Sequence, residues 1–137
     1  MAGYSGTPLA KKLGIKAGHR IYVDGGPANY LQMLEPLPAG VAPVPRLAGK
    51  VNMIHLFTKE AGALAAKLEA YRQRIAKDGM IWVSWPKKAA KVPTDVTEDV
   101  VRELALPLGL VDTKVCAVDE VWSGLKLVIR LENRRSS

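Results

Sequence analysis

The sequence has a single cysteine and no long hydrophobic run, and each absence excludes a class of protein. With Cys116 alone, no intramolecular disulfide can form and no zinc site built from several cysteines can be assembled. No segment approaches the roughly 20 consecutive apolar residues of a membrane-spanning helix, and residues 1–6 lack the basic and apolar regions of a signal peptide. We therefore expect a cytoplasmic protein without a membrane partner.

Side chains that could carry chemistry are also few. His19 and His55 are far apart and neither has a histidine or cysteine partner at metal-ligand spacing, so no metal site is predicted. His55 lies in an apolar run, which favours a hydrogen-bonded core residue. Cys116 lies in an alternating strand, where a small hydrophobe fits better than a nucleophile. The Gly-x-Ser-x-Gly signature of a serine nucleophile is absent, and no catalytic residue is predicted.

The composition is that of an ordinary folded domain with an excess of positive charge. The 137 residues are 48% hydrophobic and 24% charged, which predicts one domain spanning residues 1–137. The net charge of +7 would suit a polyanionic partner. However, the basic residues form short groups separated by acidic ones, and only 6% of residues are aromatic. These two features disfavour nucleic-acid binding, which stays open as an alternative.

The first third of the chain predicts a helix, a strand and a loop. Thr7 as cap, Pro8 at the first helical position and Gly14 as terminator predict a short helix. Residues 21–23 predict a buried strand that ends at the glycines and proline of residues 24–27. A proline-rich surface loop is expected over residues 36–50. This segment holds Pro36, Pro38, Pro43 and Pro45, which exclude a helix interior or a central strand.

The middle of the chain predicts one strand–helix–strand unit. Residues 51–57 and 80–85 are apolar on both faces, as parallel strands covered by helices should be. Between them we expect a helix over residues 59–77, capped by Thr58 and ended by residues 78–79. Its apolar stripe would consist of Leu64, Leu68, Tyr71 and Ile75.

The last third predicts a helix and a hairpin. A capping box at Asp95 and Glu98 opens a helix over residues 96–106, with Val100 and Leu104 facing inward. Alternating residues over 111–117 and 125–131 predict two strands joined by a turn at residues 122–124, followed by a frayed tail over residues 133–137. Strands alternating with helices predict a mainly parallel α/β sandwich of three layers, closed by an antiparallel hairpin.

This order resembles a truncated class I S-adenosylmethionine-dependent methyltransferase of Rossmann-like fold, in particular its C-terminal half. Residues 4–15, 82–88 and 116–128 resemble an uncharacterised bacterial family, a domain of unknown function. That resemblance covers nearly the whole chain and is weakest between Tyr30 and Lys50. It implies a Rossmann-like protein without an established activity.

The loop after the first strand departs from the methyltransferase pattern. In those enzymes the strand ends in an acidic residue, one spacer and three alternating glycines, which let the backbone approach the cofactor closely. Here Asp24 and Gly26 match the opening, but Ala28 and Tyr30 replace the second and third glycines. Pro27 also removes an N–H donor. The resemblance therefore disfavours S-adenosylmethionine as a cofactor.

Ligands of parallel α/β sheets bind beyond the carboxyl ends of the strands, so we expect one crevice there. Lys87 and Lys88 beside Trp85 could hold an anion against an aromatic face, or could form a solvated turn around a core tryptophan. Asp24 could accept from a ribose hydroxyl or from the N–H groups of its own turn. The candidate binding residues are Asp24, Gly25, Gly26, Thr58, Ser84, Trp85, Lys87 and Lys88.

The segment around residues 119–122 also faces this edge. Asp119 and Glu120 could form an acid/base pair, but adjacent strand residues point to opposite sides, which favours a solvated hairpin. Three functions follow in order of preference: a non-catalytic module that binds a small anion or a protein, a small methyltransferase-like or nucleotide-using enzyme, and a basic nucleic-acid binder. A homodimer through the terminal hairpin and Trp122 stays open.

Overall fold

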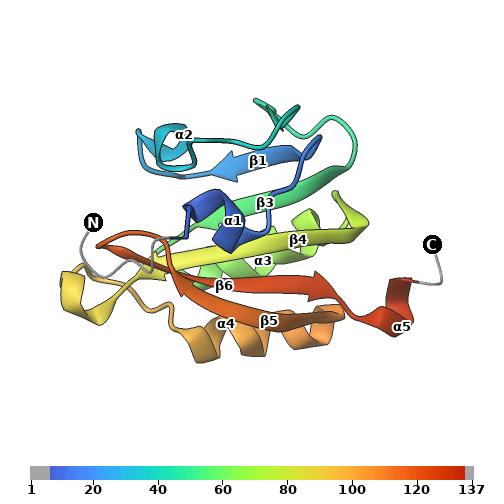
Figure 1. Cartoon of the computed structure of the whole chain (residues 1–137). Helices are drawn as coiled ribbons and strands as arrows, with labels where there is room; N and C mark the ends of the chain where they lie inside the picture. Colours follow the sequence, from blue (N-terminus) through green and yellow to red (C-terminus); the bar gives the residue numbers. More distant parts are fainter. Residues whose placement is uncertain (1–6, 135–137) are drawn as a thin grey trace.

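The computed structural model describes residues 7–134, and residues 1–6 and 135–137 lie outside that range. One sheet of six strands runs through the molecule in the order β2-β1-β3-β4-β6-β5 (Figure 1). The strands are β1 (Arg20–Asp24), β2 (Ala42–Pro43), β3 (Val51–Phe57), β4 (Ile75–Pro86), β5 (Leu110–Ala117) and β6 (Trp122–Ile129). The helices are α1 (Leu9–Leu13), α2 (Tyr30–Met33), α3 (Ala61–Arg72), α4 (Glu98–Ala105) and α5 (Leu131–Arg134), with 3₁₀ turns η1 (Lys88–Ala90) and η2 (Leu106–Leu108).

The pairing confirms the predicted mainly parallel α/β sheet. β1 pairs in parallel with β2 and β3, and β3 pairs in parallel with β4. β6 lies antiparallel between β4 and β5, so the predicted terminal hairpin is present. The carboxyl ends of β1, β3 and β4 therefore share one edge with the start of β6, where Pro86 pairs with Trp122.

Helices cover both faces of the sheet. α3 and α4 cover one face, where Leu64, Leu68 and Val101 join an apolar cluster with the strands. α1 and α2 cover the opposite face over a second apolar cluster (Figure 1). On that side the fully buried Trp82 donates its Nε1–H to the carbonyl of Leu13 at 2.9 Å, which holds the end of α1 against β4. Among residues 7–134, no helix is long and apolar enough to cross a membrane.

The predicted helix over residues 59–77 is shorter at both ends. α3 begins at Ala61, whose N–H is capped by Asp95 Oδ1 at 2.8 Å instead of by Thr58. It ends at Arg72, and Ile75 opens β4 opposite Val51. Ile75 is buried in the core, so its apolar character was interpreted correctly but its secondary structure was not.

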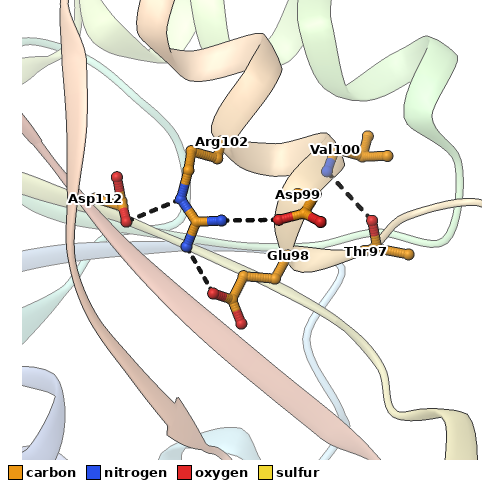
Figure 2. A network of polar contacts seen from close by, with 6 residues as sticks. All are labelled: Thr97, Glu98, Asp99, Val100, Arg102 and Asp112. Atoms are coloured by element: carbon orange, nitrogen blue, oxygen red, sulfur yellow. Dashed lines mark hydrogen bonds and ion pairs between the residues drawn. The ribbon is translucent and has the colours of Figure 1, made fainter.

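The helix predicted over residues 96–106 also begins later, because Thr97 is its cap. The Thr97 hydroxyl accepts the N–H of Val100 at 3.2 Å (Figure 2). The buried residues are Val101 and Ala105, one position beyond the predicted pair. Arg102 binds Glu98, Asp99 and Asp112, which ties α4 to β5 in the network of Figure 2.

Other corrections concern the chain ends, the loop and the hairpin. The cap residue of α1 is Pro8 instead of Thr7, whereas Gly14 ends the helix in the left-handed conformation as predicted. The expected loop over residues 36–50 contains β2, an edge strand in which a proline is tolerated. Residues 122–124 belong to β6, because the hairpin turns at residues 118–121. α5 carries helical structure to Arg134, into the predicted tail.

Candidate functional site

A chain of three buried polar side chains lies beneath the loop that follows β1. The Tyr30 hydroxyl is 2.7 Å from His55 Nδ1, and Ser84 Oγ is 2.8 Å from His55 Nε2. His55 and Ser84 are fully buried and Tyr30 is 4% exposed. A neutral imidazole has one donor nitrogen and one acceptor nitrogen. One of the two hydroxyls, of Tyr30 or Ser84, therefore accepts a hydrogen bond from the ring and the other donates one to it, so both ring nitrogens have a partner. The expectation that His55 is a hydrogen-bonded core residue is confirmed.

Aromatic packing fixes this chain in place. The His55 ring stacks on Phe57 with centroids 4.2 Å apart, and the Tyr30 ring meets Phe57 edge to face at 5.6 Å. Burial lowers the pKa of His55 to about 3 and raises the pKa of Tyr30 above its ordinary value. Both groups are therefore neutral at pH 7. Without access to water, this chain is a structural element that anchors α2 to the sheet.

Asp24 ends β1 and faces α3 on the other side of the sheet. Tyr71 donates its hydroxyl to Asp24 Oδ2 at 2.6 Å, and Lys67 Nζ lies 3.0 Å from the same oxygen. Burial and the Asp24 carboxylate raise the pKa of Tyr71. The contacts of Asp24 are thus to two α3 side chains, which neither sequence interpretation of this carboxylate included.

The two glycines after Asp24 pack tightly against the end of β3. Gly25 has φ of 76°, in the left-handed region, and a Cβ placed there would lie 3.0 Å from the carbonyl oxygen of Phe57. A Cβ on Gly26 would lie 2.7 Å from Val23 Cγ1 and 3.4 Å from Phe57 Cε1. Glycine is therefore required here by the packing of the protein against itself.

Two cavities flank this loop. The first, of about 680 Å³, lies at the carboxyl edge of the sheet between α1, the segment around α2 and the β5–β6 turn. Apolar walls make up most of it, with Lys12, Asn29, Glu35, Asp119 and Glu120 among its lining residues. The second, of about 530 Å³, lies over β1 and β2. It is lined by Ile21, Val23, Gly26, Pro27, Ala28, Tyr30, Leu31, Gln32, Pro43, Val44 and Pro45.

The structure distributes the candidate residues over different environments. Gly26 lines the second cavity, and none of Thr58, Lys87 and Lys88 lines either one. Ser84 is fully buried against His55, and Trp85 is 8% exposed within the apolar cluster under α3 and α4. Lys87 is half-buried and Lys88 is exposed. The Lys87 N–H donates to the carbonyl of Val121 at 2.8 Å, so this loop adjoins a wall of the first cavity.

Asp119 stabilises the turn of the hairpin. Its Oδ1 accepts the N–H of Val121 at 2.8 Å and that of Trp122 at 2.7 Å. Glu120 is exposed beside it. Asp119 and Glu120 both line the first cavity, although the Asp119 oxygen is committed to the backbone. Sequence reasoning missed that α1 and the α2 segment close this cavity, since no local signal marks contacts between segments so far apart.

Solved structures with a similar fold include several methyltransferases. A methyltransferase from Pyrococcus furiosus superposes with a TM-score of 0.61 at 13% identity, covering 90% of this chain and 80% of that one. Magnesium protoporphyrin IX methyltransferase (ChlM) from Synechocystis PCC 6803, with bound SAM, superposes with a TM-score of 0.61 at 12% identity, covering 88% and 74%. The O-methyltransferase NcsB1 from neocarzinostatin biosynthesis superposes with a TM-score of 0.60 at 16% identity.

The coverage of these structures varies. This chain spans 49% of the length of NcsB1, but 74% of ChlM and 80% of the Pyrococcus furiosus methyltransferase. The likeness to the last two therefore extends beyond the C-terminal half of a methyltransferase. At such identities the likeness shows the fold, which is Rossmann-like and of the methyltransferase type. No curated protein matches the chain in sequence.

One family model does match in sequence, over residues 50–131. The match includes two of the three segments on which the resemblance was based, residues 82–88 and 116–128, and leaves residues 4–15 outside. It covers β3 to β6 and the helices between them, which is more than half of the chain. The chain belongs to the family of proteins of unknown function DUF3052.

Proposed function

We propose that this protein is a non-catalytic binding module, built on a methyltransferase fold, that does not use S-adenosylmethionine. The observation that carries the proposal is the buried Tyr30, held by a 2.7 Å hydrogen bond to His55 where the methyltransferase pattern has its third glycine. Moving Tyr30 aside would leave a buried nitrogen of His55 without a partner, at a cost of about 1–3 kcal/mol. A cofactor would have to offset that cost.

The neighbouring groups support the same conclusion. Oδ2 of Asp24 is engaged by Lys67 and Tyr71, so a ligand amine or hydroxyl would have to compete with both for that oxygen. The second cavity, beside Gly26, has no carboxylate among its lining residues in the described part of the chain. A pair of ribose hydroxyls is ordinarily bound by such an acceptor. Gln32 supplies an amide there instead.

The first cavity is the better place for a ligand of this module. Its volume of about 680 Å³ suits a small molecule, and apolar walls with a few polar groups at the margin are typical of binding sites. Lys12 lies in its lining, and the Lys87 loop is hydrogen-bonded to Val121 at its wall. We propose that Lys12, with Lys87 and Lys88 outside the cavity, binds an anionic group at the margin of the cavity, away from the carboxylates of Glu35 and Glu120 that also line it.

Isothermal titration with S-adenosylmethionine tests the proposal. We expect no saturable heat at protein concentrations that would detect micromolar binding. Micromolar binding that is abolished by Asp24→Ala would refute the proposal and establish the methyltransferase-like alternative, which the fold shared with SAM-bound ChlM favours. Lys67→Met is the matched control, because it removes one of the two partners of Asp24 and keeps the carboxylate.

A second experiment tests the anionic ligand. Mass spectrometry of small molecules that co-purify with the wild-type protein would identify the ligand, and the Lys87→Glu/Lys88→Glu variant would be purified in parallel. We expect an acidic molecule whose yield falls in the variant. An equal yield from both proteins would remove Lys87 and Lys88 from the site.

A further inference from the structure

A pair of lysines occupies directly opposite positions on the two strands of the terminal hairpin. Lys114 of β5 pairs with Lys126 of β6 in the register of the sheet. Both belong to the face that α1 covers, where Trp122 and Val128 of β6 pack on the second apolar cluster. Like charges directly opposite each other across two strands are destabilising. The fold compensates part of this repulsion, because Lys114 donates to a backbone carbonyl of α1, but none of the ion pairs within residues 7–134 includes either lysine.

Both ammonium groups converge on the C-terminal turn of α1. Lys114 Nζ donates to the carbonyl of Lys12 at 2.8 Å. Lys126 Nζ lies 3.3 Å from the position that a Cβ on Gly14 would occupy. Lys16 follows directly after this turn and is exposed. Two lysine side chains thus meet at this turn, and the charge of Lys16 acts on one of them, Lys126. We call these residues the lysine face: Lys16, Lys114 and Lys126.

The lysine face has no acidic counterpart. None of the ion pairs within residues 7–134 includes Lys16, Lys114 or Lys126. Burial, then the charge of Lys114 and then that of Lys16, lower the pKa of Lys126, and no carboxylate opposes them. The nearest acidic residue along β5, Asp112, binds Arg102 of α4.

We propose that the lysine face binds the phosphate groups of a small molecule, with Lys126 and Lys114 as the central donors. A phosphate group carries several acceptor oxygens and more than one negative charge, so it can accept from two or three ammonium groups at once. It would also neutralise the repulsion between the cross-strand lysines. The proposal rests on the proposed function only in that this protein is a binding module, and it adds a phosphate site that is separate from the anionic group proposed near Lys87 and Lys88.

Pyrophosphate is the probe. Its binding is measured by isothermal titration and by thermal denaturation, with sodium chloride at the same ionic strength as the reference. We expect pyrophosphate to raise the melting temperature of the wild-type protein. Lys126→Met and Lys114→Met should each weaken binding by about tenfold, the loss of one charge-assisted hydrogen bond. Lys59→Met, at an exposed lysine between β3 and α3, should bind like the wild type. Lys126→Arg should retain binding.

A readout specific to the site comes from NMR titration of the Lys126 side chain. Bound pyrophosphate should raise the pKa of Lys126 in the wild-type protein, which a purely structural lysine would not show. Binding lost in Lys87→Glu/Lys88→Glu but kept in Lys126→Met would overturn this site and leave the proposed function standing. No effect of pyrophosphate beyond ionic strength would also overturn it. Tighter binding of ADP than of pyrophosphate would support the site and identify a nucleotide as the carrier.

Discussion

Acidification should destabilise the protein through His55. The ring is fully buried, and burial lowers its pKa from the ordinary 6.5 to about 3, whereas in the unfolded chain it returns to about 6.5. Between these two values the unfolded state binds more protons than the folded state, so the free energy of unfolding falls as the pH falls. The stabilisation is fully present above pH 6.5. Lowering the pH from 7 to 5 should remove about 2 kcal/mol.

Urea denaturation at pH 7, 6 and 5, followed by tryptophan fluorescence, measures this loss. In His55→Gln the decline between pH 7 and 5 should shrink by about 2 kcal/mol, because the group that takes up the proton on unfolding is gone. His19→Gln is the comparison. The pKa of this other histidine is also lowered, by burial and by Lys16, but its ring is only partly buried, so its loss should reduce the decline less than the loss of His55. An identical pH dependence in the wild type and His55→Gln would refute the reasoning. If His55→Gln does not fold, NMR of the wild-type ring at pH 5 should show it neutral.

Four further substitutions test the packing and a helix cap. Gly26→Ala should destabilise the protein by about 1–3 kcal/mol in chemical denaturation, because its Cβ would lie 2.7 Å from Val23 Cγ1, whereas Gly62→Ala in α3 has open space and should stabilise by about 0.5–1 kcal/mol. Tyr30→Phe should cost about 1–3 kcal/mol by leaving a His55 nitrogen unpaired, with the fluorescence spectrum unchanged. Thr97→Ala should cost about 1 kcal/mol through the lost cap of α4, and helical content by circular dichroism should fall slightly.

Elements with continuous apolar character could be predicted from the sequence. β3 has the predicted bounds because six of its seven residues are buried, which is the pattern of a strand covered on both faces. The end of α3 could not be predicted, because Ile75 fits both a helical stripe after Tyr71 and the start of a strand. Gly79, which was expected to end the helix, lies within β4, where a Cβ would lie 2.9 Å from the carbonyl oxygen of Ala76 and 3.0 Å from that of Asn52.

The site depends on contacts between segments far apart in the sequence. The polar chain joins three segments, with Tyr30 and His55 separated by 25 positions and His55 and Ser84 by 29. A serine at the end of an apolar strand is equally compatible with a ligand contact, which is how Ser84 became a candidate. The cap of α3 similarly comes from Asp95, 34 positions away, instead of from the adjacent Thr58. Only Tyr30 carried a local signal, because it interrupts the glycine pattern.

We propose that the loop after β1 does not hold S-adenosylmethionine, because Tyr30 is hydrogen-bonded to His55 and the two glycines are packed against β1 and β3, even though a cavity of about 530 Å³ lies beside Gly26. Amide NMR spectra recorded during a titration with S-adenosylhomocysteine at millimolar concentration test this claim residue by residue. We predict that the amide signals of Gly25, Gly26 and Tyr30 do not move. Saturable shifts at these three positions, together with loss of the Tyr30–His55 hydrogen bond, would contradict it.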